Sequence, residues 1–277
     1  MPKMERLPVP PRWSAPLKRF EAHLRMAGRA DTTIKTRIDR LRNFARYVGG
    51  SPMTTRTGTV ERYAAEHEWR PETRRSIYST LKGFYGWLVE VGYRSDNPAS
   101  VLPVVKAAPP APKPAPTATI KVAMGCADER TKLIIMLAAF AGLRRGEIAQ
   151  VSETDLVEDL TGYSLIVHGK GNKQRVVPVS DSLAAAIRVA GKGSWCFPGR
   201  NDGHLSAKYV GKLAKRALPD GIHLHMLRHR FASAAYAGTS DLLSVQQLLG
   251  HSSPATTQLY IAIPNVRLRR VAEAAAA

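Results

Sequence analysis

Cysteine is nearly absent from this sequence of 277 residues. Cys126 and Cys196 are the two that occur, and neither belongs to a C-x-x-C pair. This scarcity argues against a disulfide framework and against a zinc site built on cysteines. It is typical of proteins in a reducing compartment, so we expect a cytoplasmic protein.

Long hydrophobic runs are also missing. The longest, from Leu133 to Leu143, is about half the length of a bilayer-spanning helix. The segment from Met1 to Pro11 is basic and rich in proline, and no apolar run follows it, so it does not resemble a signal peptide. We therefore expect no membrane partner.

Acidic residues are scarce relative to basic ones. The chain has 22 Asp and Glu against 41 Lys and Arg, which gives a net charge of +19. An excess this large, spread over the whole chain, favours a polyanionic partner such as nucleic acid. An anionic membrane surface is the alternative, but no lysine-rich amphipathic tail supports it.

What the sequence does contain is helical periodicity in its first hundred residues. Apolar spacing predicts helices at 13–26, 34–48, 60–69 and from Pro71 to near Gly92. We expect the polar run at 31–33 to cap the second helix at its start, and Gly49 and Gly50 to end it. A set of basic residues then suggests a surface that meets DNA phosphates, with an ordinary solvated face as the alternative: Arg40, Arg74, Arg75 and Lys82.

The stretch at 103–116 contains six prolines, which predicts an extended linker. Beyond it we expect helices at 117–124, 128–141, 182–190, 206–217, 224–237, 242–249, 255–263 and 266–275. Two β-rich runs, 164–167 and 175–179, flank a glycine-containing turn and predict an antiparallel hairpin. The expected fold is mainly α-helical with a small antiparallel β-hairpin or sheet, in two domains.

The residues that could carry chemistry lie in this second part. Arg144 and Glu147 would share a helical face, where the carboxylate could orient the guanidinium toward a phosphate. An ordinary intrahelical pair is the simpler interpretation of these two residues. Lys170, with a glycine on each side, would stand at the hairpin tip, where a solubilising turn is the more usual interpretation of a single lysine.

His225 and Arg228 also share a helical face, and His229 follows four residues after His225. Histidines at this spacing, with His251 as a third, could be metal ligands, although the glutamate of the metalloprotease pattern is missing. Gly250 ends one helix and Pro254 opens the next, which places Tyr260 on a late helix where a core tyrosine would be ordinary. Taken together, two arginines, a lysine, two histidines and a tyrosine suit phosphoryl transfer without a metal.

The order and spacing of these motifs resemble the tyrosine recombinases, the family of phage integrases and Xer-type recombinases. The matching segments are AGLRRGE at 141–147, GKGNKQR at 169–175, HMLRHRFA at 225–232 and LLGHSS at 248–253, with Tyr260 nine residues after His251. The resemblance covers about 117–263. The first domain matches by size, helical character and position, without a preceding arm-binding domain, which favours an Xer-like organisation.

The resemblance implies a site-specific recombinase that cleaves and rejoins DNA through a 3′-phosphotyrosine intermediate. Tyr260 would be the nucleophile, His225 the general base and Lys170 the general acid. The remaining catalytic positions would be Arg144, Arg228 and His251, with Glu147 in support. Arg145, His229 and Lys173 are weaker candidates, the first and last as DNA contacts.

The resemblance also implies a domain plan and partners. Residues 1–105 would be a helical core-type DNA-binding domain, 106–116 a proline-rich linker, and 117–277 the catalytic domain with a C-terminal tail. Four protomers would hold two duplexes and exchange strands through a Holliday junction, without ATP or Mg²⁺, in a bacterial or phage-infected cell. An accessory directionality protein is a further candidate partner. A non-cleaving DNA-binding protein and a metal-dependent nuclease remain the alternatives.

Overall fold

The computed structural model describes residues 8–106, 112–169 and 173–250. The chain divides into two compact units, Met1–Ala108 and Pro109–Ala277. The helices and one small antiparallel sheet confirm the expected fold class, mainly α with a minor β component. No helix in the described ranges is long and apolar enough to cross a bilayer.

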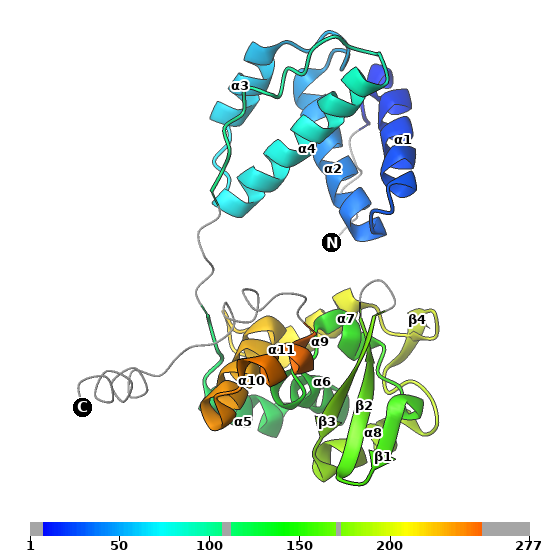
Figure 1. Ribbon diagram of the computed structural model, residues 1–277, viewed down its shortest axis with the longest axis vertical. Coiled ribbons are helices and arrows are strands. Elements are labelled where there is room, and N and C mark those ends of the chain that lie inside the picture. Colours follow the sequence, from blue (N-terminus) through cyan, green and yellow to red (C-terminus); the bar gives the residue numbers. More distant parts are fainter. Residues whose placement is uncertain (1–7, 107–111, 170–172, 251–277) are drawn as a thin grey trace, which may run out of the picture. The chain divides into compact units, whose positions relative to one another are not determined.

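The first unit consists of four helices, α1 (Pro11–Met26), α2 (Asp31–Val48), α3 (Thr57–Ala65) and α4 (Pro71–Glu90). Proline occupies the first turn of α1 and of α4, where its missing N–H costs nothing. Figure 1 shows α2 between α1 and α4, and α2 packs against both. Their facing side chains form an aromatic core in which the Trp13 and Phe84 rings stack with centroids 5.7 Å apart.

Two details of this unit differ from the sequence prediction. The expected cap residue Asp31 is the first residue of α2, and Ala30 holds the cap position without a side-chain bond. An acidic residue in the first turn still complements the helix dipole. The third helix ends at Ala65, earlier than expected, and Trp69 packs instead against Tyr63, with ring centroids 5.2 Å apart.

The second unit is built around α6 (Glu129–Phe140), which is buried on nearly every side. A helix that is apolar all round belongs in the middle of a domain. The other helices of this unit are α5 (Thr117–Cys126), α7 (Arg145–Ala149), α8 (Asp181–Gly191), α9 (Ala207–Ala217), α10 (Leu224–Thr239) and α11 (Leu242–Leu249). In Figure 1 α10 and α11 lie side by side, and α10 packs against α6.

The β structure is larger than the predicted hairpin. The sheet has the antiparallel order β1 (Leu156–Asp159), β2 (Gly162–His168), β3 (Gln174–Val179), and β4 (Pro198–Asn201) is a separate short strand. The sequence prediction missed β1 and β4, because four-residue strands are too short to display alternation. Leu165 of β2 pairs with Leu156 on one side and Val177 on the other.

Candidate active site

Glu147 lies at the centre of a cluster of arginines in the second unit. Its side chain is 5% exposed. The Arg144 backbone N–H donates to Glu147 Oε2 at 2.8 Å, and Arg144 Nη1 donates to Oε1 at 2.8 Å. The sequence had suggested that Arg144 lies within a helix. In the structure Arg144 is instead the N-cap of α7. The carboxylate therefore caps α7 and orients Arg144 at the same time.

Arg175 of β3 binds the same carboxylate, a contact that sequence reasoning missed. Its Nη1 and Nη2 donate to Glu147 Oε1 and Oε2 at 2.9 and 2.8 Å, a bidentate pair. The signal was available in principle: Arg175 shares the inward side of β3 with buried Val177. An arginine at an inward strand position needs a buried acceptor.

Arg228 of α10 is the third guanidinium. The residue is 1% exposed, and its Nη1 lies 3.7 Å from Glu147 Oε2. Nη1 also donates to the Gly142 carbonyl, and Nη2 donates to the Leu249 carbonyl at 2.6 Å. We call Arg144, Glu147, Arg175 and Arg228 the arginine–glutamate cluster.

Each arginine of this cluster also donates to the carboxyl end of α11. Arg175 Nε donates to Leu248 O at 2.7 Å, Arg228 Nη2 to Leu249 O, and Arg144 Nη2 approaches Gly250 O at 3.4 Å. Carbonyls in the last turn of a helix lack intrahelical partners and carry partial negative charge. Three consecutive carbonyls are thus satisfied by three different arginines.

The electrostatics of the cluster keep Glu147 ionised. Burial on its own would raise the Glu147 pKa, but the hydrogen bonds and charge of Arg175, followed by the bonds from Arg144, lower it to about 2. One carboxylate faces three guanidiniums, so the cluster retains an excess of two positive charges. Such a site suits an anionic ligand.

A pocket of ≈ 790 Å³ opens beside this cluster, between α7, α9 and the start of α10. We call it the basic pocket; the charged and histidine side chains that line it are Arg144, Arg145, Lys215, Asp220, His223, His225 and Arg228. Arg145 lies against Gly211 of α9, where a β-carbon would come within 2.8 Å of Arg145 Cδ. The sequence candidates Arg144, Arg145, His225 and Arg228 therefore meet at one pocket.

His225 and His229 lie one turn apart on α10 and meet edge to face, with ring centroids 4.6 Å apart. Burial, followed by the charges of Arg228, His223 and Arg144, lowers the His225 pKa from its ordinary value. Burial and neighbouring His225 and Arg228 lower the His229 pKa to about 4. Both shifts favour the neutral form of the imidazole over the charged form. Within the described ranges, no three His, Cys, Asp or Glu side chains are grouped to hold a metal ion.

The turn end of the β2–β3 hairpin is held by a polar network. His168 Nε2 lies 2.9 Å from Asp155 Oδ1, and the Gly169 N–H donates to Lys173 O at 2.7 Å. Lys173, a DNA-binding candidate, is exposed next to this turn. The predicted catalytic residues Lys170, His251 and Tyr260 lie outside the described residues, as do the helices expected at 255–263 and 266–275.

The basic candidates of the first unit lie on α2 and α4. Arg40 of α2 donates to Ser76 Oγ of α4, and burial together with the charge of Arg37 lowers the Arg40 pKa. Crowded like charges are costly unless an anion neutralises them. Arg75 is exposed, whereas Arg74 and Lys82 are half-buried.

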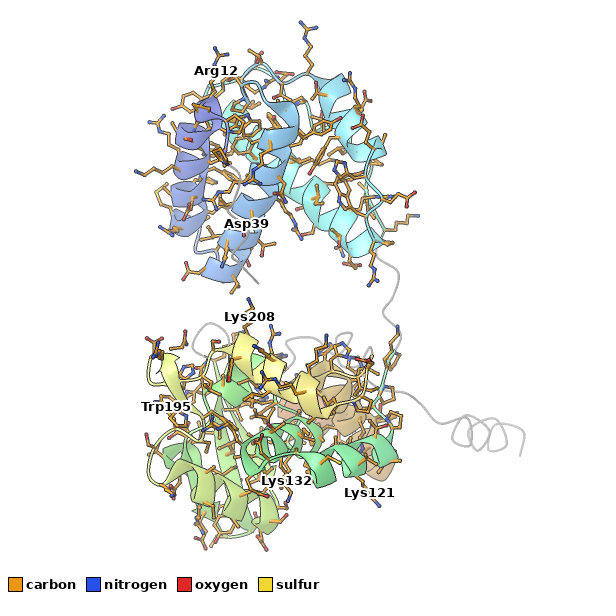
Figure 2. The ribbon with its side chains drawn as sticks, turned by 180° about the vertical axis from the view of Figure 1, so that it is seen from behind. Arg12, Asp39, Lys121, Lys132, Trp195 and Lys208 are labelled. Carbon is orange, nitrogen blue, oxygen red and sulfur yellow. The ribbon has the colours of Figure 1, made fainter. Side chains whose placement is uncertain are left out.

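A further basic surface on α9 was not singled out from the sequence. Lys208, Lys212 and Lys215 are all exposed and follow helical spacing along one face. Lys208 points away from the body of its unit into solvent (Figure 2). Because Lys215 also lines the basic pocket, this face extends the positive surface beyond the arginine–glutamate cluster.

Comparison with known proteins identifies relatives that cover most of the chain. Residues 117–265 match the model of the phage integrase family. The chain is 35% identical over 241 residues to a tyrosine recombinase XerC of Xanthomonas axonopodis pv. citri (strain 306), covering 76% of this chain and 75% of that protein. It is 34% identical over 221 residues to a tyrosine recombinase XerD of Rhizobium meliloti (strain 1021), covering 69% and 70%.

A solved structure shows a similar fold. The crystal structure of a lambda integrase dimer bound to a COC′ core site superposes with a TM-score of 0.74, covering 90% of this chain and 76% of that chain. Its sequence identity is 18%, so this likeness concerns the fold alone.

Proposed function

This chain belongs to the phage integrase family and is a tyrosine-type site-specific DNA recombinase, and from that premise we propose that it works through a covalent 3′-phosphotyrosine intermediate. In the proposed step the Tyr260 oxygen attacks the scissile phosphorus. A P–O bond to tyrosine forms and the bond from phosphorus to the 5′-oxygen breaks. Attack by a 5′-hydroxyl on the phosphotyrosine reverses the step and rejoins the strand.

Two protons move in this step. A free tyrosine has a pKa near 10 and is a weak nucleophile at neutral pH, so it needs a base and nearby cations. His225 takes the tyrosine proton, and its lowered pKa supports this role because the ring is neutral and ready to accept. Lys170 protonates the leaving 5′-oxygen, and His251 donates a hydrogen bond to the phosphate.

The observation that carries the proposal is the convergence of Arg144, Arg228 and His225 on the basic pocket. Negative charge grows on the non-bridging oxygens in the transition state, and preorganised guanidiniums stabilise it. Arg144 and Arg228 now donate to carbonyls of Gly250, Gly142 and Leu249. Phosphate binding therefore exchanges some of these neutral acceptors for charged oxygens, which form stronger hydrogen bonds.

The proposed partner is double-stranded DNA carrying a core site. The lambda integrase structure of similar fold is bound to such a site, and the charge of +19 supports a polyanionic ligand. We assign residues 1–105 to core-site binding through Arg40, Arg74, Arg75 and Lys82, 106–116 to a linker, and 117–277 to catalysis. Arg145 and Lys173 are DNA contacts of the catalytic part.

Strand exchange requires more than one protomer. In the proposed assembly four protomers hold two duplexes and pass through a Holliday junction, and an accessory protein sets the direction. Because the phosphotyrosine ester keeps the energy of the broken bond, the reaction needs neither ATP nor a metal ion.

The test is trapping of the covalent intermediate. The substrate is a nicked duplex carrying the core site that the wild-type protein selects from a random-sequence library. We expect a covalent protein–DNA band with wild-type protein in EDTA, and none with Tyr260→Phe, which should still shift the duplex. Cleavage that requires a divalent ion, or a covalent band that persists in Tyr260→Phe, would contradict the proposal.

A further inference from the structure

Glu147 creates a difficulty for the proposed function, on which this inference rests. A buried carboxylate lies within reach of both guanidiniums that must hold the phosphate, with Arg144 Nη1 at 2.8 Å and Arg228 Nη1 at 3.7 Å. Like charges repel strongly in a partly desolvated site. An uncompensated Glu147 would compete with the phosphate for the same donors.

Arg175 supplies the compensating charge. It engages both Glu147 oxygens through a bidentate pair and is 12% exposed. Its remaining donor, Nε, is bound to Leu248 O at 2.7 Å. All three donor nitrogens of this guanidinium are therefore engaged within the protein, whereas 42% of the Arg144 side chain remains exposed beside the basic pocket.

We propose that Arg175 is a positioning residue for DNA cleavage: it neutralises Glu147, so that Arg144 and Arg228 act on the phosphate, and it ties β3 to the carboxyl end of α11. The second part follows from the chain path. Arg175 follows the predicted general acid Lys170 by five residues, and Leu248 precedes the predicted phosphate ligand His251 by three. One guanidinium thus connects three segments that carry predicted catalytic motifs: α7, β3 and the carboxyl end of α11.

The charged groups that face Glu147 come from three elements. They are Arg144 at the start of α7, Arg175 on β3 and Arg228 on α10. Helix α9 also packs against α7, but its lysines at 208, 212 and 215 are exposed. Arg175 provides the largest stabilisation of the ionised form of Glu147, so its removal raises the Glu147 pKa.

The experiment compares wild-type protein with Arg175→Gln, Arg175→Lys and the double variant Arg175→Gln, Glu147→Gln. The rate of covalent complex formation is measured on the selected nicked duplex between pH 5.5 and 8.5 (about three pH units, spanning the ordinary imidazole range). We expect Arg175→Gln to slow cleavage about 100-fold at pH 8, the scale associated with misplacement of a reacting group. DNA affinity should change by no more than a few-fold.

The pH dependence separates positioning from folding. In Arg175→Gln, protonation of Glu147 removes its competition, so the deficit relative to wild type should shrink as the pH falls. The rate of each variant is divided by the wild-type rate at the same pH, which cancels the titration of His225. The double variant lacks the carboxylate, so its rate of covalent complex formation should be at least tenfold higher than that of Arg175→Gln. The ratio of its rate to the wild-type rate should not change with pH.

The controls make each outcome decisive. Arg175→Lys keeps a positive charge but loses the fork, and should be intermediate in rate. Arg188→Gln removes an exposed arginine that pairs with Tyr163 and Glu158 in the same unit, and should cleave like wild type.

A folded Arg175→Gln that cleaves at the wild-type rate would overturn this inference and leave the proposed function intact. So would a double variant slower than Arg175→Gln, which would mean a structural role alone. Absence of a covalent complex with wild-type protein would overturn the proposed function, and this inference with it.

Discussion

At the scale of single residues, the protein depends on a carboxylate that is both buried and ionised. Glu147 caps α7, orients Arg144 and receives the fork of Arg175. A buried ion pair is weak evidence for stability, but removal of one partner leaves an uncompensated charge and is costly. This asymmetry leads to a prediction about acid unfolding.

Acid should destabilise the protein partly through Glu147. Its pKa is about 2 in the folded state against an ordinary 4.5, so the unfolded state binds more protons between these values. The stability contributed by Glu147 is complete above about pH 4.5 and is lost as the pH falls toward 2. It is on the order of 3 kcal/mol, since one pKa unit corresponds to about 1.4 kcal/mol.

Urea unfolding of wild type and Glu147→Gln at several pH values measures this contribution. Glu147→Gln should be less stable by about 3–5 kcal/mol at pH 7, and the difference should narrow as the pH falls. Asp128, Asp159 and Asp241 also have lowered pKa values, but they are common to both proteins and cancel. A difference that stays constant with pH would contradict the assignment.

Gly142 is a second residue whose identity the site requires. Its φ is +66°, and a β-carbon there would come within 2.5 Å of Phe231 Cδ1. Gly142→Ala should therefore lower the free energy of unfolding by about 2–4 kcal/mol, from left-handed strain and overpacking. Because the Gly142 carbonyl accepts from Arg228, cleavage should slow as well.

The matched control for Gly142→Ala is Gly125→Ala in α5. No atom lies within 4 Å of the added methyl at Gly125, and alanine favours a helix. This variant should be as stable as wild type or slightly more so. Equal stability of Gly142→Ala and Gly125→Ala would contradict the packing argument.

At the scale of elements, the candidate site is assembled from the ends of short segments. The N-terminus of α7, the inward side of β3, the first turns of α10 and the carboxyl end of α11 each contribute one part. Apolar periodicity placed α10 and α11 well, because both bury a stripe against neighbouring elements. It did not place β1, whose outward residues are largely exposed.

The exposed lysines of α9 lead to a prediction at this scale. Lys208→Ala combined with Lys212→Ala should weaken DNA binding, and the slope of log K against log salt should become shallower by about 2. Titrations between 50 and 200 mM salt (about the range over which such contacts are felt) measure the slope. The variant should remain as stable as wild type.

The matched control for the α9 double variant is a second double variant, Lys121→Ala with Lys132→Ala. Figure 2 shows both lysines away from Lys208 in the same unit. The two double variants lose the same charge, so a general effect of net charge should appear in both. Equal slopes would mean that α9 contributes no specific phosphate contacts.

At the scale of the whole molecule, the described part of each unit has a large hydrophobic core of its own. One contains Trp13, Leu41 and Phe84, and the other contains Ile135 and Leu165. Separate cores predict two unfolding transitions.

Leu41→Ala and Ile135→Ala test this prediction, because each side chain is fully buried in a different core. Each substitution should destabilise its own unit by about 2–5 kcal/mol and leave the other transition in place. Calorimetry of both variants measures the two transitions. A single transition that both substitutions shift together would contradict independent units.

The sequence by itself indicated the family and the helical character, and it predicted Arg144, Glu147, His225 and Arg228 as candidate site residues. These features depend on local spacing, since residues three or four apart on a helix share a face. The roles of Lys170, His251 and Tyr260 come from the same motif order and remain predictions.

Only the tertiary structure decided how the site residues are paired. Arg175 is 28 positions from Glu147 and 73 from Leu248, and Arg144 is 106 from Gly250. No local periodicity encodes contacts over such separations, because they arise when different elements pack around a shared core. A short sequence window displayed Arg144 beside Glu147, and folding added Arg175, which binds both carboxylate oxygens.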